Sequence, residues 1–256
     1  MEAKLTLIKV GGQIVEEHET LQQLLSDFAK IDGHKVLVHG GGRAATRIAA
    51  QLGIESPMVN GRRVTDKKML EVVTMVYGGL VNKQIVAGLQ ALGVNALGLT
   101  GADMNCMRSE KRPVKEVDYG FVGDVKEVNA GILSELIAKG ITPVLAPLTH
   151  DKNGNLLNTN ADTIAAEAAK ALAQYFEVTL VFCFEKKGVL RDANDDNSVI
   201  PEITKPLFEQ YLADGTIQGG MIPKLENAFD AIAAGVKQVF ISKADEITQY
   251  TGTIIV

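Results

Sequence analysis

The sequence predicts an α/β fold built around a mainly parallel sheet. The first observation is a short apolar run, Leu5–Val10, that is followed directly by two glycines. The second is a repeat of this arrangement after one helical segment, where Val36–His39 is followed by Gly40–Gly42. Short apolar runs bounded by glycine are typical of buried strands. Because adjacent parallel strands end at the same edge of a sheet, we expect both glycine loops to lie at that edge.

The first half of the chain alternates predicted helices and strands. The spacing of apolar residues predicts helices over residues 19–30 and 43–52, a hairpin over 59–65 with a turn at Asn60-Gly61, and a long helix over 66–92. Asp66 is the expected N-cap of the long helix, and its interior glycines, Gly78 and Gly79, predict a kink or a close approach. A strand at 94–99, β-hairpins within 105–128, a helix that Asn129 caps and that ends near Gly140, and a strand at 141–146 follow.

The second half continues this alternation. The run His150–Asn155 is a turn signal between two short strands, and Asn158–Asp162 opens an alanine-rich helix that extends to about residue 173. A strand at 178–184, helices at 204–212 and 225–234, a strand at 239–242 and a final edge strand at 252–256 complete the chain. No linker separates the halves, so we expect one continuous sheet.

Composition limits the classes of function. The chain has 256 residues and a net charge of −5, so it carries no general basic field for nucleic acid. No apolar run reaches membrane-spanning length, and the N-terminus lacks the pattern of a signal peptide. Cys106 and Cys183 are far apart and show no metal-ligand spacing. These features predict a reduced, cytoplasmic protein of the size of an enzyme, with no nucleic-acid or membrane partner.

A lysine inside the first strand indicates anion binding. Burying an unpaired ammonium is costly, so Lys9 should point from the end of the strand toward an anion. Gly11 and Gly12 lack a Cβ, which allows the backbone amides to approach a ligand closely. The Gly-Lys-Ser/Thr order of a Walker A loop is absent. The alternative is a tight turn beside a lysine whose ammonium reaches solvent.

Two further stretches resemble the first loop in chemistry. Lys224 follows Gly219, Gly220 and Pro223 at a predicted helix start, and such junctions favour anions. Asp162 lies in the first turn of another predicted helix. The alternatives are a surface lysine and a carboxylate that serves the helix as an N-cap or through its dipole. Two lysines, phosphate-type loops and one carboxylate together favour phosphoryl transfer, in which a protein mainly positions groups and neutralises charge.

Six motifs make the sequence similar to the amino acid kinase family over nearly its whole length. They are Lys9-Val-Gly-Gly12, His39-Gly-Gly-Gly42, Asn60-Gly-Arg-Arg-Val-Thr65, Leu157-Asn-Thr-Asn-Ala-Asp162, Gly220-Met-Ile-Pro-Lys224 and Gly252-Thr253. The third and fourth resemble the branch that phosphorylates the γ-carboxylate of N-acyl-L-glutamates. The resemblance implies an open three-layer αβα sandwich. It also implies an N-terminal lobe, residues 1–173, for the acyl-amino acid and dimerisation, and a C-terminal lobe, residues 174–256, for ATP.

The resemblance also implies roles for individual residues. Lys9 would contact the transferring phosphoryl group, Lys224 would stabilise the departing phosphate, and Asp162 would orient both lysines without acting as a base. The other implied contacts are Gly41, Gly42, Arg63 and Asn158 for the substrate, and Gly11, Gly12, Glu185, Gly188 and Gly220 for phosphate and nucleotide. ATP is the implied cofactor, with Mg²⁺ held through the ATP phosphates and no metal ligand from the protein.

The sequence departs from the family pattern at the nucleotide-side loop. A Ser/Thr-Asp-Val run commonly ends that strand in the family, whereas Cys183-Phe-Glu-Lys-Lys-Gly188 stands here, with Glu185 as the replacement for the aspartate.

Family members regulated by arginine carry an additional N-terminal helix that this sequence lacks. We therefore expect no arginine feedback and no hexamer built through that helix.

Two arginines beside the motifs leave the identity of the substrate's acyl group undecided. Arg62 either faces solvent, because neighbours on a strand point to opposite faces, or reaches the acyl end of the substrate at the turn. Arg43 is an alternative contact. A guanidinium there would pair with an acyl group that ends in a carboxylate, as in N-succinyl-L-glutamate. Two further functions stay open, a non-catalytic ligand sensor on the same fold and a kinase that acts on a different carboxylate.

The long helix predicts self-association. Its apolar residues occupy more than one face, which exceeds what one sheet face usually covers. They include Leu70, Val73, Met75, Val76, Leu80, Val81, Ile85, Val86 and Leu89. A symmetric homodimer is the simplest arrangement that would bury the remainder.

Overall fold

An eight-stranded sheet forms the centre of the computed structural model, which describes residues 3–59, 61–192, 194–244, 246–249 and 251–256. Its order is β12-β14-β13-β11-β1-β2-β8-β5, and among the described strand pairs of this sheet only β13–β14 is antiparallel. The strands are β1 Lys4–Val10, β2 His34–His39, β5 Ala96–Leu99, β8 Thr142–Leu145, β11 Glu177–Phe184, β12 Glu202–Ile203, β13 Gln238–Lys243 and β14 Thr253–Ile255. The predicted α/β class is confirmed.

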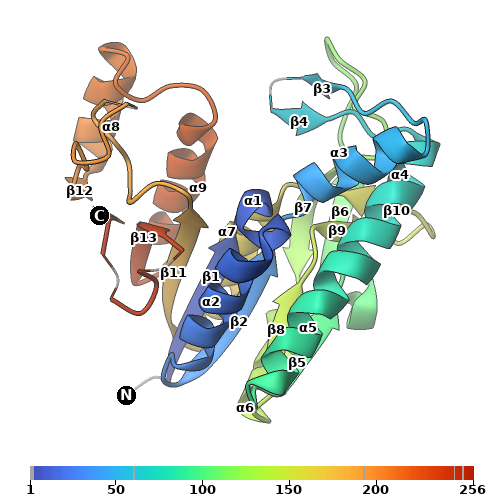
Figure 1. Cartoon of the computed structure of the whole chain (residues 1–256), viewed down its shortest axis with the longest axis horizontal. Coiled ribbons are helices and arrows are strands. Elements are labelled where there is room, and N and C mark those ends of the chain that lie inside the picture. Colours follow the sequence, from blue (N-terminus) through green and yellow to red (C-terminus); the bar gives the residue numbers. More distant parts are fainter. Residues whose placement is uncertain (1–2, 60, 193, 245, 250) are drawn as a thin grey trace.

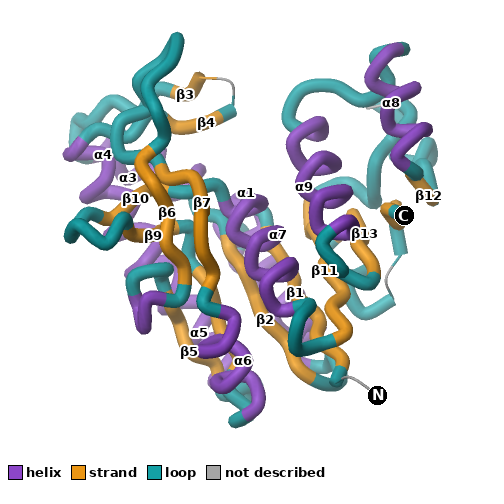
Figure 2. Tube along the Cα trace, turned by 180° about the vertical axis from the view of Figure 1, so that it is seen from behind, coloured by secondary structure: helices purple, strands orange, loops and turns teal. Residues whose placement is uncertain are grey.

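Helices cover both faces of this sheet (Figures 1 and 2). On one face lie α1 Gly12–Glu16, α2 His18–Ala29, α3 Gly42–Gln51, α4 Lys67–Val73 and α5 Asn82–Ala91, and on the other α6 Ala130–Ala138, α7 Ala161–Leu172, α8 Lys205–Ala213 and α9 Met221–Ala233. Alternation along β1 divides the core, because Leu5 and Leu7 pack on the α7 side whereas Ile8 and Val10 pack on the α2 side. The three-layer αβα arrangement is therefore confirmed, and Lys9 shares its face with Leu7.

A smaller sheet lies beyond one end of the main sheet (Figure 1). It has the order β10-β9-β6-β7, and the separate hairpin β3–β4 lies near it. The strands are β3 Met58–Val59, β4 Arg62–Arg63, β6 Met107–Lys111, β7 Gly123–Val128, β9 Leu148–His150 and β10 Leu156–Asn158, and a 3₁₀ turn, η2, covers Asp103–Asn105. These elements confirm both predicted hairpin regions, although Asn60 lies outside the described residues.

The predicted long helix is confirmed with a π-helical centre. η1, Thr74–Val81, joins α4 to α5 and contains both interior glycines, while Asp66 caps α4 by accepting a hydrogen bond from the Met69 amide at 2.7 Å. A Cβ on Gly78 would be 3.4 Å from Leu148, so the helix approaches β9 closely there.

By length and composition the helix Lys67–Ala91 would qualify as a membrane span, a test that core helices also pass.

Three boundaries differ from the prediction. The segment 252–256 is not an edge strand, because β14 lies between β13 and β12. α9 begins at Met221 rather than at residue 225, since Pro223 is tolerated in the first turn of a helix. The five-residue α1, which starts at Gly12, was not predicted.

Candidate active site

The two glycine loops lie against each other at the ends of β1 and β2. The Gly40 amide donates a hydrogen bond to the Val10 carbonyl at 2.9 Å. A Cβ on Gly12 would be 3.4 Å from the Gly42 nitrogen and 3.5 Å from the Gly41 nitrogen, so glycine permits this approach. The prediction that both loops share one sheet edge is confirmed. Gly11 borders the end of β11, because its Cβ position is 3.5 Å from the Cys183 carbonyl oxygen.

Lys9 and Lys224 converge on one carboxylate. Lys9 Nζ lies 2.7 Å from Asp162 Oδ1, and Lys224 Nζ lies 3.6 Å from Asp162 Oδ2. The Lys9 and Asp162 side chains are buried, with 8% and 12% of their surface exposed. Burial alone would raise the pKa of Asp162, but the two lysines outweigh it and hold the pKa below its usual value of 3.8. The carboxylate is therefore ionised at neutral pH.

Asn160, not Asp162, caps the helix that carries this carboxylate. The Asn160 side-chain oxygen accepts hydrogen bonds from the amides of Asp162 and Thr163 at 2.8 and 3.2 Å. The alternative interpretation of Asp162 as an N-cap is wrong, and its side chain is left for the lysines.

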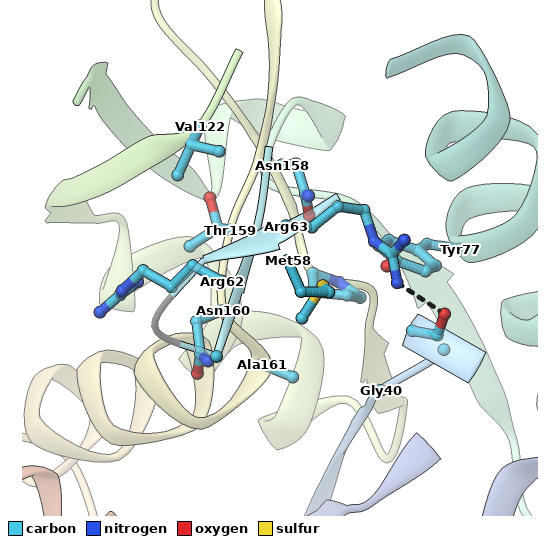
Figure 3. A pocket seen from close by; sticks show the side chains of 14 residues that line it. Gly40, Met58, Arg62, Arg63, Tyr77, Val122, Asn158, Thr159, Asn160 and Ala161 are labelled. Carbon is cyan, nitrogen blue, oxygen red and sulfur yellow. Dashed lines mark hydrogen bonds between the residues drawn. The ribbon is translucent and has the colours of Figure 1, made fainter. Parts of the chain in front are cut away.

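A cavity of about 170 Å³ adjoins the second glycine loop, and all four residues predicted to contact the substrate line it (Figure 3). Gly41, Gly42, Arg63 and Asn158 line it. Arg63 Nη2 donates to the Gly42 carbonyl at 2.8 Å and to Thr46 Oγ1 at 2.9 Å, whereas Nη1 is buried without a partner among the described residues. Asn158 Nδ2 donates to Thr65 Oγ1 at 2.9 Å. Within the described part of the chain, the guanidinium group beside the cavity thus keeps one buried nitrogen without a hydrogen-bond partner.

The two additional arginines differ in position. Arg62 is half-buried, lines the cavity and points away from Arg63 (Figure 3). Burial and the neighbouring Arg112 lower the pKa of Arg62, although Asp124 opposes them. Arg43 is exposed and is not among the residues that line the cavity.

Several lining residues were missed by the sequence analysis. Tyr77 packs on the glycine loop, since a Cβ on Gly41 would be 2.7 Å from its Cδ1 atom. Thr159 and Asn160 also line the cavity, and they lie inside a motif of which the sequence analysis assigned roles only to Asn158 and Asp162.

A buried histidine supports the second glycine loop. His39 Nδ1 lies 2.8 Å from the Gly40 carbonyl and Nε2 lies 3.1 Å from Asn82 Nδ2, which also donates to the Val144 carbonyl at 2.9 Å. Burial lowers the pKa of His39 to about 4. The ring is therefore neutral, with one nitrogen as donor and the other as acceptor. The sequence analysis used His39 as the end of a strand and the start of a motif without giving it a role, and it missed Asn82.

A second cavity, of about 420 Å³, lies on the C-terminal side of the fold. Gly188 lines it, together with Lys186, Arg191 and Met221. A Cβ on Gly188 would be 2.7 Å from Thr253 Oγ1, so this glycine is required for packing. Glu185 and Gly220 are exposed and do not line the cavity.

The site fits nucleotide phosphates better than a metal bound by protein ligands alone. Among the described residues, no group of three or more His, Cys, Asp or Glu side chains is placed to hold a metal ion. The carboxylate of Asp162 already faces two ammonium groups. The lysines and the amides of the glycine loops are groups of the kind that bind phosphate oxygens.

Known proteins are similar to this chain over nearly its whole length. The sequence model described as "Amino acid kinase family" matches residues 4–243. The chain is 77% identical to the acetylglutamate kinase of Parabacteroides distasonis, covering 98% of each chain, and 74% identical to the acetylglutamate kinase of Bacteroides thetaiotaomicron, covering 100% of this chain and 99% of the relative. The crystal structure of smu.665 from Streptococcus mutans has a TM-score of 0.81 at 32% identity and 98% coverage of both chains. With the glycine loops, the paired lysines and the parallel sheet, these matches establish that the chain belongs to the amino acid kinase family.

Proposed function

We propose that the chain is a phosphotransferase that uses ATP to phosphorylate the γ-carboxylate of N-acetyl-L-glutamate, as a step of arginine biosynthesis. The relatives at 77% and 74% identity are named acetylglutamate kinase, and both are covered almost completely. The observation that carries the proposal is the convergence of Lys9 and Lys224 on Asp162 beside the two glycine loops.

The reaction needs charge neutralisation rather than a base. A γ-carboxylate has a reference pKa of about 4.3 and is already ionised at neutral pH. The obstacle is its repulsion from the ATP phosphates. Lys9 and the glycine amides would stabilise the transferring phosphoryl group, and Lys224 the departing phosphate. Asp162 would keep both ammonium groups in place, and Mg²⁺ held through the ATP phosphates would supply further positive charge.

The cavity beside Gly42 fits the amino-acid end of the substrate. Arg63 Nη1, buried without a partner among the described residues, would pair with the α-carboxylate. Asn158, fixed by Thr65, would supply the second contact, and the amides of Gly41 and Gly42 would bind the reacting end of the substrate.

The two lobes would divide the substrates between them. Residues 1–173 contribute Lys9, Asp162 and the small cavity, and residues 174–256 contribute Lys224 and the larger cavity. We assign ATP to the second lobe, with Gly11, Gly12, Gly188 and Gly220 near its phosphates and Glu185 in the loop beside them. An acyl phosphate is sensitive to water, so closure of the lobes would protect the product.

We further propose a cytoplasmic homodimer that forms through the long helix. Met75 and Leu80 on η1 are 55% and 43% exposed. Exposed apolar side chains in a contiguous helix are the type of surface that a second copy covers in a symmetric dimer.

A coupled assay of ADP release tests the function. We expect turnover with ATP, Mg²⁺ and N-acetyl-L-glutamate and none with L-glutamine as the acceptor. Tight binding of acylglutamates without any turnover would instead identify a ligand sensor on the same fold.

A second candidate substrate is N-succinyl-L-glutamate, and one observation favours it. Arg62 lines the cavity, and Arg112 lies close enough to lower the pKa of Arg62. Arg112 lines a neighbouring cavity and pairs with Asp124, so of these two guanidinium groups only that of Arg62 lines this cavity, where it would suit an acyl group that ends in a carboxylate.

The ratio of kcat/KM for the two substrates separates these candidates. If Arg62 binds a succinyl carboxylate, Arg62→Leu lowers kcat/KM for the succinyl compound at least tenfold, a change of about 1.4 kcal/mol, and leaves the acetyl compound nearly unaffected. Arg43→Leu is the matched control, because Arg43 is exposed and does not line the cavity. A preference for the acetyl compound that Arg62→Leu does not alter removes Arg62 from acyl selection.

A further inference from the structure

Phe184 contacts both lysines of the site. The Lys9 ammonium lies 5.2 Å from the centre of the Phe184 ring, and the Lys224 ammonium lies 4.6 Å from it. Both distances are within the range of cation–π attraction. The two ammonium groups therefore share two partners, the carboxylate of Asp162 and the ring of Phe184.

The sheet places this ring by strand register. Lys9 on β1 is paired with Phe182 on β11, and Val10 with Cys183. Side chains alternate along a strand, so Phe182 and Phe184 project on the same face as Lys9. α7 and α9 pack on that face and bring Asp162 and Lys224 to it. Phe184 is the last residue of β11 and stands where the ring can reach lysines from two different elements.

The charge balance explains why a ring is useful at this position. Two ammonium groups face one carboxylate, which leaves one positive charge in excess and the two cations near each other. The face of an aromatic ring carries negative electrostatic potential, so it attracts both cations without becoming a competing anion for phosphate. A lysine side chain also has a flexible four-carbon stem, and a fixed ring restricts where its ammonium group lies.

We propose that Phe184 is a positioning residue that holds Lys9 and Lys224 in place for phosphoryl transfer. The inference rests on the proposed function for its catalytic consequence, whereas the contact between ring and lysines stands independently.

Kinetics of Phe184 variants test the positioning role. Phe184→Leu should lower kcat at least fivefold with little change in the KM for the acylglutamate, and Phe184→Tyr, which retains the ring, should restore most of kcat. Phe240→Leu is the matched control, because Phe240 is a partly buried ring on the neighbouring strand β13 that packs on the opposite face of the sheet. A Phe184→Leu enzyme with unchanged kcat, or a loss that Phe184→Tyr does not restore, would overturn the role.

Replacing Phe184 with mono-, di- and trifluorophenylalanine separates electrostatics from shape. Fluorine withdraws electron density from the ring, which weakens the negative electrostatic potential of the ring face, and it changes the size of the side chain little. We therefore expect kcat to fall stepwise with the number of fluorines. Equal kcat across the series would contradict a cation–π contribution.

A spectroscopic measurement tests the contact even if the protein shows no turnover. Protons near a ring face are shifted upfield, so the ε-CH₂ resonances of Lys9 and Lys224 should move downfield in Phe184→Leu and remain in place in Phe184→Tyr and Phe240→Leu. Assignment uses the spectra of Lys9→Met and Lys224→Met. Absence of turnover in the native protein with these shifts present would refute the proposed function alone, whereas absence of the shifts would refute the contact.

Discussion

Lys9 and Asp162 form a buried ion pair, 2.7 Å from Nζ to Oδ1, between the first strand of the chain and the first turn of α7. The pair lies at the end of the sheet where both glycine loops meet. Because Lys224 from α9 reaches the same carboxylate, one ionised side chain connects three elements. Structure and proposed chemistry therefore depend on the same charge.

Asp162→Asn should destabilise the fold by about 3 kcal/mol at pH 7, because two partly buried lysines lose their counter-charge. The pKa of Asp162 is depressed in the folded state, so its contribution is present above pH 3.8 and is lost as the pH falls through the lower, folded pKa. Urea unfolding of native and Asp162→Asn proteins between pH 7 and pH 3 measures this. The gap should stay constant down to about pH 4 and then narrow, and a gap that closes between pH 7 and pH 5 would show that another group is responsible.

Lys9→Ala and Lys224→Ala should each lower kcat by about a hundredfold or more and change KM much less. Each lysine is assigned to charge that develops in the transition state, and loss of such a donor acts mainly on kcat. Steady-state kinetics with Lys30→Ala as the control checks this, since Lys30 is 62% exposed and pairs only with Asp27 among the described acidic side chains. Near-normal kcat in Lys9→Ala would contradict its role.

His39 should make the fold less stable as the pH falls from 7 to 5. Its folded pKa of about 4 lies below the ordinary value of 6.5, so the unfolded chain takes up a proton that the buried ring does not. Between pH 7 and pH 5 this difference corresponds to about 2 kcal/mol. Urea unfolding at both pH values should show this loss in the native protein and its absence in His39→Gln. Equal pH dependence in the two proteins would mean that His39 is protonated in the fold.

The exposed apolar residues of η1 should mediate dimer formation. Light scattering at micromolar concentration should give the mass of a dimer for the native chain and of a monomer for a Met75→Glu, Leu80→Glu double variant. Val114→Glu is the control, because Val114 is equally apolar and 62% exposed but lies in a hairpin loop away from the long helix. A native chain that remains a monomer under these conditions would refute the dimer.

The strands and glycine loops of the site were predictable because their signals are local. An ammonium group inside an apolar run, as at Lys9, requires an anion nearby, and glycine pairs after successive strands require a shared edge. The capping residues Asp66 and Asn129 were predictable for the same reason, since a cap acts on amides three residues away.

The remaining features depend on contacts between distant segments. The role proposed for the Phe184 ring requires β11 to lie beside β1 and α9 to pack beside α7 on the same side of the sheet. The role of His39 depends on its contact with Asn82 on α5. The lack of a Cβ at Gly188 likewise permits packing against Thr253, a residue far along the chain that the sequence pattern does not reveal. β12 has only two residues and carries no periodicity that a sequence could reveal.

Trapping of the product with hydroxylamine tests the central claim most directly. An acyl phosphate reacts with hydroxylamine to give a hydroxamate, so incubation of the chain with ATP, Mg²⁺, N-acetyl-L-glutamate and hydroxylamine should yield the γ-hydroxamate in a one-to-one ratio with ADP. N-acetyl-L-glutamine, which lacks the γ-carboxylate, should give neither product. Release of ADP without hydroxamate, or at the same rate with N-acetyl-L-glutamine, would show that the γ-carboxylate is not the phosphoryl acceptor and would contradict the proposed function.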